Sequence, residues 1–347
     1  MTSKIDLRNL TFAELQDWIA AIGLEPYRAE QISRWIFLPD VQSFDQMTNL
    51  SKKWRRLFHE QAYLSRLIIL KNETSSDGTR KFLLELEDGE RVESVLIPER
   101  GHYTLCISSQ VGCAQKCRFC YTGKMGLKRN LKASEILNQV LTVQRTLAET
   151  GPLLTNIVLM GMGEPLDNFE NTIRALKTFL SPVGMQFSHR HVTLSTAGLI
   201  PEMKALGNLL PVNLAVSLNA ADDPTRSRLM PINRKYPLAP LIQACKAFPL
   251  PHKKMITIEY ILIKGINDSP QAAKTLAKLL KEVKAKINLI PLNTHPGSGF
   301  KPPDEAGLLK FQDILIQSQY TVMIRRSKGG DISAACGQLH ADWTSPK

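Results

Sequence analysis

Residues 103–123 read YTLCISSQVGCAQKCRFCYTG, an apolar strand-like run followed by a loop with three cysteines. Cys113, Cys117 and Cys120 have the spacing C-x3-C-x2-C. Thiolates are soft ligands that bind iron–sulfur clusters, zinc or copper. A structural zinc site needs four ligands, usually in two pairs, and this loop supplies three. Three thiolates on a four-iron cluster leave one iron open to a small molecule, so the spacing favours a reactive cluster over a degenerate zinc knuckle.

Length and composition are those of an ordinary soluble globular protein. The 347 residues, 43% hydrophobic and 22% charged, suit one large domain, alone or with a smaller module. The chain has no run of about 18 or more apolar residues, so no transmembrane helix is expected. The first residues, MTSKIDLRNLTFAEL, do not resemble a signal peptide. Six cysteines in so long a chain do not indicate a disulfide scaffold. We therefore expect a protein of the reducing cytoplasm, with no membrane partner.

The net charge of +12 favours a polyanionic partner, with nucleic acid the leading candidate. Residues 1–60 hold eight basic and eight acidic side chains, so the whole excess lies beyond residue 60. The basic residues form three clusters: Lys124, Lys128, Arg129 and Lys132; Arg226, Arg228, Arg234 and Lys235; and Arg325, Arg326 and Lys328. A solubilising surface is the alternative explanation of this charge.

The first 60 residues predict a small helical module. Thr11 and Glu14 form a capping box for a helix over 11–22, and a second helix follows Pro26. A third helix places four basic residues beside Trp54. Those basic residues suit contact with RNA, and a solvated helix face explains them nearly as well.

Residues 80–98 alternate between apolar and polar around Asp88-Gly89, which predicts a β-hairpin. Within it, Glu93 lies among apolar neighbours in VESVLIP, and an outward-facing strand residue is its ordinary interpretation. We expect three parts: a helical accessory domain over 1–60 that binds RNA, a hairpin connector over 61–100, and a core over 101–347.

From residue 103 onward, strand-like and helix-like stretches alternate, which predicts a parallel sheet. Six such units suit a partial (βα)6 barrel of the TIM type better than a closed eight-fold barrel. The expected strands are 103–109, 155–160, 191–195, 212–218, 256–263 and 286–291. The expected helices lie near 133–149, 168–180, 200–208, 238–247 and 269–283.

Five polar or glycine-rich stretches each follow one of these strands. Ligands of such folds bind at the carboxyl ends of the strands, so the five stretches are expected on one rim. Each alone could be a turn or a strand-end cap, whereas together they predict a pocket for a ligand that bears an amino acid and a sugar. They are Gly112–Gly123, GMGEP over 161–165, Ser195-Thr196, Ser217–Asn219 and Asn293.

With a C-x3-C-x2-C loop after the first strand and GEP after the second, the chain resembles the radical S-adenosylmethionine (SAM) superfamily. Its finer resemblance, over nearly the whole chain, is to the RlmN/Cfr family of RNA adenine methyltransferases. The motifs that carry this resemblance are VESVLIP (92–98), SSQVGCAQKCRFCYTG (108–123), RNLKASEI (129–136), GMGEPLDN (161–168), STAG (195–198), RLMPIN (228–233) and DISAACGQL (331–339).

The resemblance assigns roles to individual residues. It implies one [4Fe-4S] cluster on Cys113, Cys117 and Cys120. It implies Cys336 as an S-methylcysteine intermediate, Cys106 as a resolving thiol that forms a transient disulfide with Cys336, and Glu93 as proton acceptor. The SAM contacts it implies are Gly163, Glu164, Ser195, Ser217, Leu218, Asn219 and Asn293, and Asn219 stands where the family usually has histidine. Cys245 matches no family motif and is expected in the core.

The chemistry of adenine explains why such parts are needed. Its C2 carbon is electron-poor and cannot attack a methyl sulfonium, whereas a carbon radical can add to it. In the family scheme a first SAM methylates Cys336, and a second yields a 5′-deoxyadenosyl radical that abstracts hydrogen from the S-methyl group. The methylene radical adds to adenine, and thiolate exchange by Cys106 releases the product. The cofactor supplies the radical and the protein supplies placement.

The resemblance also implies substrates and partners. We expect C2 methylation of an adenine in 23S rRNA at the peptidyl-transferase centre and of the adenine 3′ of the anticodon in tRNA, by a monomer that receives electrons from reduced flavodoxin or ferredoxin. The first alternative is the C8-methylating branch of the same family, which the motifs do not separate. The second is a non-catalytic RNA-binding protein with a structural metal, which would need neither Cys106 nor Cys336.

Overall fold

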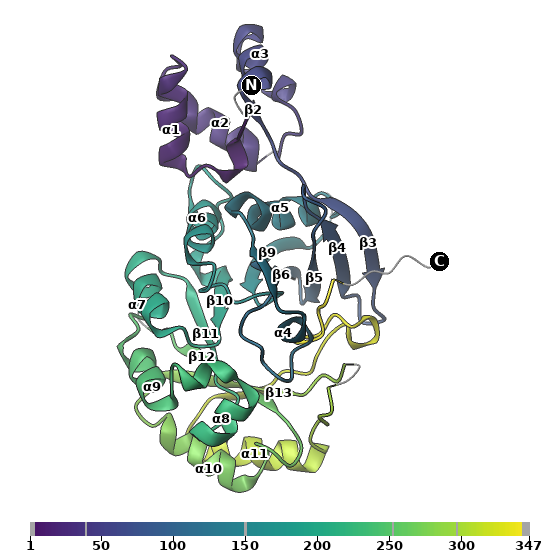
Figure 1. The fold of residues 1–347 in the computed structure, drawn as a ribbon, viewed down its shortest axis with the longest axis vertical. Helices are drawn as coiled ribbons and strands as arrows, with labels where there is room; N and C mark the ends of the chain where they lie inside the picture. Colours follow the sequence, from purple (N-terminus) through teal and green to yellow (C-terminus); the bar gives the residue numbers. More distant parts are fainter. Residues whose placement is uncertain (1–3, 39, 149–150, 252, 296–297, 342–347) are drawn as a thin grey trace.

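A ten-stranded sheet in the order β14-β13-β12-β11-β10-β9-β6-β5-β4-β3 forms the centre of the computed structural model (Figure 1). The structure describes residues 4–38, 40–148, 151–251, 253–295 and 298–341. From β6 to β14 every neighbouring pair is parallel. These strands are β6 His102–Cys106, β9 Leu153–Leu159, β10 Val192–Thr196, β11 Asn213–Ser217, β12 Ile256–Leu262, β13 Ala285–Pro291 and β14 Val322–Ile324.

This order confirms the predicted partial barrel, because the chain runs strand by strand toward one edge without closing on itself. All six predicted strands are present, and their bounds differ from the predicted ones by a few residues at most. The short β14 is a seventh parallel strand that the pattern did not predict. Its three residues are too few to show a periodicity, and only the pairing with β13 makes them a strand.

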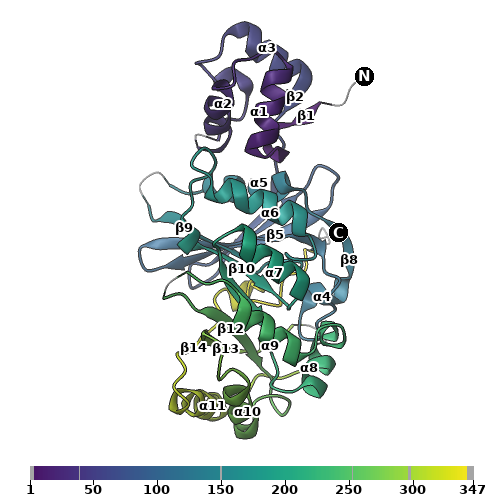
Figure 2. The ribbon, with the colours of Figure 1, turned by 90° about the vertical axis from the view of Figure 1, so that its left-hand side faces the viewer.

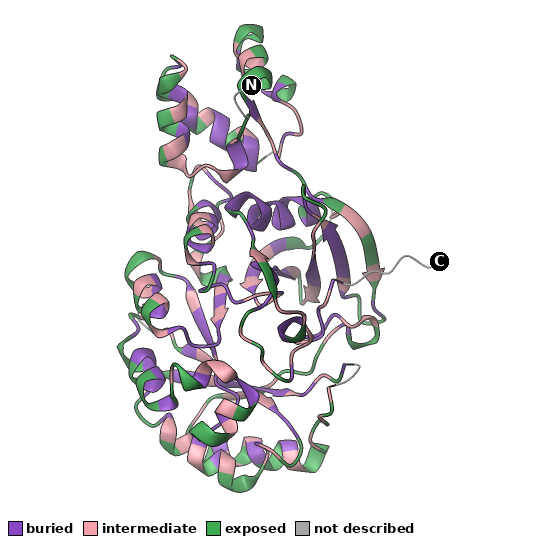
Figure 3. Ribbon diagram, viewed as in Figure 1, coloured by how far each residue is buried: buried purple, intermediate pink, exposed green. Residues whose placement is uncertain are grey.

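Helices follow the parallel strands and lie along the outer side of the barrel (Figure 2). Five match the predicted stretches: α5 Ala133–Gln144, α6 Phe169–Leu180, α7 Ile200–Leu209, α9 Leu238–Ala247 and α10 Pro270–Leu279. Three were not predicted: α4 Tyr121–Met125, α8 Asp223–Leu229 and α11 Glu305–Gln317. Short 3-10 turns lie at η3 His189–His191, η4 Pro231–Arg234 and η5 Gly330–Ile332. Buried residues concentrate in the parallel strands and in α5 (Figure 3).

The predicted hairpin is confirmed as β4 Arg80–Glu85 and β5 Arg91–Glu99, and it belongs to the large sheet. Strand β5 pairs antiparallel with β6, and an additional strand, β3 Ile68–Thr74, pairs with β4 at the sheet edge. Gly89 has a φ of +81°, a left-handed conformation that favours glycine in the turn. The hairpin thus extends the barrel sheet beside Cys106, the last residue of β6.

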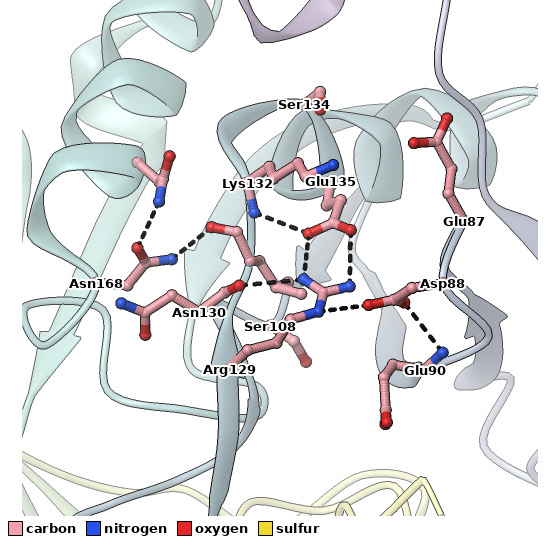
Figure 4. A network of polar contacts seen from close by, with 12 residues as sticks. Glu87, Asp88, Glu90, Ser108, Arg129, Asn130, Lys132, Ser134, Glu135 and Asn168 are labelled. Carbon is pink, nitrogen blue, oxygen red and sulfur yellow. Dashed lines mark hydrogen bonds and ion pairs between the residues drawn. The ribbon is translucent and has the colours of Figure 1, made fainter. Parts of the chain in front are cut away.

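The hairpin turn is bound to the segment that leaves the three-cysteine loop (Figure 4). Strand β8 Leu127–Asn130 pairs with β7 Gln110–Gly112, and its Arg129 donates to Asp88 Oδ2 at 2.7 Å. The same guanidinium donates to both carboxylate oxygens of Glu135, at 2.8 and 2.9 Å. Bidentate contacts of this kind fix orientation as well as distance. The turn, the loop exit and the start of α5 are therefore held together.

The N-terminal module contains α1 Phe12–Ala21, α2 Arg28–Phe37 and α3 Lys52–Gln61, with short turns η1 Leu7–Asn9 and η2 Phe44–Gln46. Its first strand, β1 Ile5–Asp6, pairs parallel with β2 Ala62–Tyr63. The predicted capping box is present: Thr11 N donates to Glu14 Oε2 at 2.7 Å, and Glu14 N donates to Thr11 Oγ1 at 3.3 Å. Ile19, Ile32 and Phe58 are fully buried and belong to an apolar core that is continuous with that of the barrel.

Arg8 joins this module to the barrel. Its side chain is completely buried and donates to the carbonyl oxygen of Ser65 at 2.7 Å, to Asn138 Oδ1 at 3.1 Å and to Asp40. Burial lowers the pKa of Arg8 to about 10, against the opposing effect of Asp40. Arg174 on α6 also binds Glu14 at 2.6 Å, and Ser134 N at the start of α5 donates to Asn9 Oδ1 at 3.2 Å, so several contacts fix the module to the barrel. Among the described residues, no helix is long and apolar enough to cross a membrane.

Candidate active site

The loop from Gly112 to Gly126, here called the thiol loop, carries the three clustered cysteines. Gly112 has a φ of +77°, and a Cβ there would lie 1.8 Å from the carbonyl oxygen of Gly126. A Cβ at Gly123 would lie 3.0 Å from the backbone N and O of Cys117. Cys113 N donates to that same Gly126 oxygen at 3.0 Å. The loop closes on itself only because glycine occupies these positions.

Cys113, Cys117 and Cys120 line one cavity, here called the inner cavity. Burial raises the pKa of all three thiols, that of Cys113 to about 12, and each of Cys113 and Cys117 is raised further by neighbouring thiols. Among the described side chains, no three His, Cys, Asp or Glu residues already stand at metal-binding spacing. The donor set nonetheless suits an iron–sulfur cluster, because three soft sulfurs face one space and metal binding displaces thiol protons.

Five of the seven predicted SAM contacts line the inner cavity: Gly163, Glu164, Ser195, Ser217 and Asn219. They lie at or just after the carboxyl ends of β9, β10 and β11, so the predicted rim of strand ends exists. At Gly163 (φ +99°) a Cβ would lie 2.5 Å from the Gln110 side chain. The backbone at this turn therefore lies so close to β7 that only glycine fits there.

The Glu164 carboxylate faces the inner cavity and is held by two backbone N–H groups. Ala197 N donates to Oε2 at 2.7 Å, and Leu166 N donates to Oε1 at 3.1 Å. Burial raises the pKa of Glu164 to about 7, although these backbone hydrogen bonds oppose the rise. Glu164 thus connects the turn after β9 with the end of β10, and an ammonium group would relieve the cost of its buried charge.

Leu218 and Asn293 do not line the inner cavity. Leu218 is buried, and its carbonyl oxygen accepts from Arg226 Nε at 3.0 Å. Asn293 Nδ2 donates to the carbonyl oxygen of Cys336 at 3.1 Å. Asn219 lines the cavity, but its Oδ1 already accepts from Ile261 N at 2.8 Å, and its φ is +58°. The asparagine side chain therefore stabilises the strand ends.

Cys336 and Cys106 line a second cavity, here called the outer cavity. Cys336 lines the inner cavity as well, as do Met160, Glu259 and Ile290. Cys336 is accessible to water because cavities adjoin it on both sides, while the surrounding chain still raises the pKa of its thiol. Burial, followed by the charge of Cys336, raises the pKa of Cys106 strongly. All six cysteines are free thiols.

Cys336 lies in an irregular segment, Gly329–His340, here called the carrier loop. Its anchors come from distant parts of the chain. Tyr121 N donates to the carbonyl oxygen of Gly337 at 2.7 Å, and Thr122 Oγ1 donates to that of Leu339 at 2.6 Å. Gln338 Nε2 reaches the carbonyl oxygen of Thr294 at 2.7 Å. The start of α4 therefore seats the carrier loop directly against the thiol loop.

Glu93 is a further anchor of the carrier loop. Its Oε2 accepts from His340 N at 2.8 Å, and its Oε1 lies 3.3 Å from Lys81 Nζ. Glu93 is 4% exposed, so the outward-facing interpretation of this residue is wrong. The structure places Glu93 at the end of the carrier loop, outside the lining of both cavities.

Arg226 is a site residue that the sequence pattern placed in a basic cluster expected to meet a polyanionic partner, but its burial leaves it unable to do so. Its side chain is completely buried and donates to the carbonyl oxygens of Ala197 at 2.7 Å and Leu218 at 3.0 Å. It also donates to Asn233 Oδ1 at 2.9 Å. Burial lowers the pKa of Arg226 to about 10. One guanidinium thus braces the ends of β10 and β11 behind the inner cavity. Its position in a helix that was not predicted hid this role.

Comparison with known proteins agrees with this arrangement. Residues 5–64 match the "Ribosomal RNA large subunit methyltransferase N-terminal domain", and residues 107–277 match the "Radical SAM superfamily". The chain is 55% identical to the dual-specificity RNA methyltransferase RlmN of Desulfosudis oleivorans, over 97% of this chain and 91% of that protein. It is 52% identical to the protein of the same name from Geobacter sulfurreducens, over 98% and 93%.

A solved structure shares the fold over nearly the whole chain. A radical SAM methyltransferase from Sphaerobacter thermophilus superposes with a TM-score of 0.92 and 42% sequence identity. The match covers 97% of this chain and all of that one.

Proposed function

This chain belongs to the RlmN family of dual-specificity RNA methyltransferases within the radical SAM superfamily, and on that premise we propose the reaction that its two cavities support. The chain is a radical SAM enzyme that methylates RNA. Its substrates are an adenine of 23S rRNA at the peptidyl-transferase centre and the adenine 3′ of the anticodon in tRNA. The methyl group enters at C2. Both RNAs are cytoplasmic, so the enzyme acts there, and we propose that it acts as a monomer.

The observation that carries this proposal is that Cys336 lines both cavities. On one side it faces the space bordered by Cys113, Cys117 and Cys120. On the other side it faces the space bordered by Cys106. A group carried on Cys336 sulfur can therefore be loaded from the inner cavity and presented in the outer one. A non-catalytic RNA-binding protein would have no use for this placement.

A [4Fe-4S] cluster on the three thiols and SAM beside it, when bound, would supply a methyl group and a radical-generating electron transfer. The chain's own part is placement. Gly163, Ser195 and Ser217 border the position of SAM, and Glu164 offers its carboxylate to the ammonium group. The buried rim keeps bulk water away from reactive species, which is the protein's main contribution to such chemistry.

In the outer cavity Cys336 acts as the methyl carrier and Cys106 as the resolving thiol. After the carbon has been transferred to adenine, the Cys106 thiolate attacks Cys336 sulfur. An S–S bond forms, the bond from Cys336 sulfur to the new methyl carbon breaks, and that carbon takes the proton that completes the methyl group. Glu93 is the proposed acceptor of the adenine C2 proton. Glu93 binds His340 N beneath the carrier loop and lines neither cavity, so we propose that it reaches the adenine when the carrier loop moves.

Two basic surfaces suit two partners. Arg325, Arg326 and Lys328 border the outer cavity, where the target adenine must enter, and we assign this surface to RNA. A separate hollow on the other side of Cys117 is bordered by Lys116, Arg118 and Lys124. It suits an acidic electron donor such as reduced flavodoxin or ferredoxin, since complementary charge speeds docking.

The C8-methylating branch of the family is the second candidate, and the product distinguishes the two. We propose mass spectrometry of rRNA and tRNA from cells that lack this gene and from cells that regain it. The expected result is 2-methyladenosine in both RNAs only when the gene is present. An 8-methyladenosine product would overturn the C2 assignment, and unchanged RNA in both strains would overturn the proposed function.

A further inference from the structure

Glu259 is a buried carboxylate at the boundary between the two cavities, and the reaction described above gives it no role. It lies on β12, where it pairs in register with Ser217 of β11 and Asn288 of β13. Its side chain is 6% exposed. It lines the inner cavity and the outer cavity, and Cys336 does the same. A charged group in the middle of a parallel sheet is costly, so its presence requires an explanation.

The neighbours of Glu259 leave one carboxylate oxygen without a partner. Asn288 Nδ2 donates to Oε1 at 2.9 Å, and no described residue donates a hydrogen bond to Oε2. Two cations act on the carboxylate from a distance, Arg325 after β14 and Lys286 on β13, and neither forms an ion pair with it. Asn288 Oδ1 is itself buried without a partner. The carboxylate is thus oriented by one amide and otherwise available to the cavity.

We propose that Glu259 accepts the proton of the Cys336 thiol when that thiol is methylated. The inference rests on the proposed function, in which SAM methylates Cys336. In this step the S–H bond of Cys336 breaks and its electron pair forms a bond to the methyl carbon of SAM. The bond from that carbon to the sulfonium sulfur breaks, which leaves a neutral thioether, and the proton passes to Glu259.

Charge balance favours an acceptor inside the cavity. The step consumes the positive sulfonium and, with the proton on Glu259, also removes the negative carboxylate, so these two buried charges disappear together. A thiol attacks through its thiolate, and the enclosure of Cys336 disfavours the thiolate. Burial also raises the pKa of Glu259, which makes its carboxylate a stronger base than an exposed one.

The other carboxylates near Cys336 are already engaged. Glu164 lines the inner cavity alone and accepts from two backbone N–H groups. Glu99 lines the outer cavity alone, and Lys328 Nζ lies 3.5 Å from its Oε2. Glu93 accepts from His340 N and pairs with Lys81, and it lines neither cavity. Among the described carboxylates, Glu259 alone shares both cavities with Cys336.

The test is a single-turnover measurement of Cys336 methylation in the Glu259→Gln protein reconstituted with its cluster. Glutamine can still accept the hydrogen bond from Asn288 through its amide oxygen, so the fold should be retained. Methyl-labelled SAM is added without RNA, and the Cys336 peptide is followed by mass spectrometry. We expect methylation to slow by about 10²–10⁴-fold, the range of general base catalysis, with partial recovery in Glu259→Asp.

Glu170→Gln is the matched control, because this exposed carboxylate in the first turn of α6 lines neither cavity. That variant should methylate Cys336 at the normal rate. A second readout needs neither cluster nor SAM: the rate at which iodoacetamide alkylates Cys336. Since the Glu259 charge raises the pKa of Cys336, Glu259→Gln should speed alkylation severalfold while it slows SAM-dependent methylation. A purely structural role would not produce opposite changes.

Two results would overturn the inference: an unchanged or faster rate of SAM-dependent methylation in Glu259→Gln, or an unchanged rate of alkylation. Failure of the proposed function is distinguishable from both outcomes. In that case the unsubstituted protein itself would never carry a methyl group on Cys336, whereas the alkylation rates would still report whether Glu259 faces the thiol.

Discussion

The thiol loop and the carrier loop meet at the same cavity but are positioned by different kinds of contact. The hydrogen bonds that close the thiol loop are local: Cys120 N donates to the carbonyl oxygen of Cys117, and Cys113 N donates to that of Gly126. One long-range bond, from Arg118 N to the carbonyl oxygen of Leu229, adds to them. The carrier loop instead depends on long-range hydrogen bonds. One of them runs from Thr122 to Leu339, which are 217 positions apart in the sequence. The three thiols that must act as a set therefore lie within one short segment, and the single carrier thiol is brought to them by the fold.

This difference has an energetic consequence. A neutral hydrogen bond contributes about 1 kcal/mol net, and the carrier loop depends on a handful of them, because it contains the short turn η5 and Cys336 itself lies outside any helix or strand. Such a loop can detach from its position and return to it at a modest cost in free energy. The thiol loop cannot, because its close backbone approaches at Gly112 and Gly123 leave no room for rearrangement. Four predictions test this contrast.

We expect the largest effect when one of the three cysteines of the thiol loop is removed. Cys117→Ala should abolish cluster assembly and reduce RNA methylation by more than about 10³-fold, because two thiolates do not replace three. Iron content and methylated RNA are the measurements. Cys245→Ala is the matched control: that thiol is 2% exposed in α9, away from both cavities, and its variant should keep iron and activity. Full iron content in Cys117→Ala would contradict the assignment.

The next prediction separates the two loops. Cys336→Ala should abolish RNA methylation while iron content and SAM binding stay normal, because the carrier thiol lies outside the cluster set. Cys106→Ala, in contrast, should accumulate a covalent protein–RNA adduct that denaturing gels detect. Loss of iron in Cys336→Ala would mean that the two loops do not act independently.

A smaller effect is expected from one anchor of the carrier loop. Asn293→Ala removes the hydrogen bond to the carbonyl oxygen of Cys336. A net loss of about 1 kcal/mol corresponds to roughly a fivefold lower rate of RNA methylation. Asn171→Ala is the control, since it removes one amide hydrogen bond away from both cavities, from Asn171 Nδ2 to the side chain of Asn168 just before α6. Equal losses in the two variants would argue against a specific role for Asn293.

The smallest effect concerns pH. Burial acts to raise the pKa of Asp77, but N–H groups of Thr79 and Gly329 outweigh it and lower that pKa to about 2. A lowered carboxyl pKa stabilises the fold above the ordinary value near 3.8, and this contribution is lost as pH falls toward 2. The Gly329 amide should therefore lose exchange protection in this window.

The comparison amide for that experiment is Cys113 N, which donates to a backbone carbonyl oxygen and has no carboxylate partner. Amide exchange followed by mass spectrometry should show a pH-dependent loss at Gly329 and none at Cys113. Asp77→Asn should remove the pH dependence at Gly329. Parallel loss at both amides would instead report general acid unfolding.

Short sequence patterns predicted many of the helices and strands because they reflect interactions between residues close together in the chain. The alternation around Asp88-Gly89 predicted the hairpin, and the Thr11–Glu14 box predicted the start of α1. Strand β14 and helix α8 were missed, since both are too short to show a period. The role of Arg226 was missed because its charge suggested a polyanionic partner, whereas five hydrogen-bond acceptors compensate its burial.

By itself the sequence determined the three clustered cysteines, the barrel class and the family, because each can be recognised from residues that lie close together in the sequence. Only the tertiary structure decided which groups meet. Glu93 proved to be buried under the carrier loop, Asn293 binds the backbone of Cys336, and Glu259 stands between the cavities. These meetings depend on strand register and on long-range loop closure. Neither leaves a local pattern, because a parallel strand finds its neighbours through packing across the sheet.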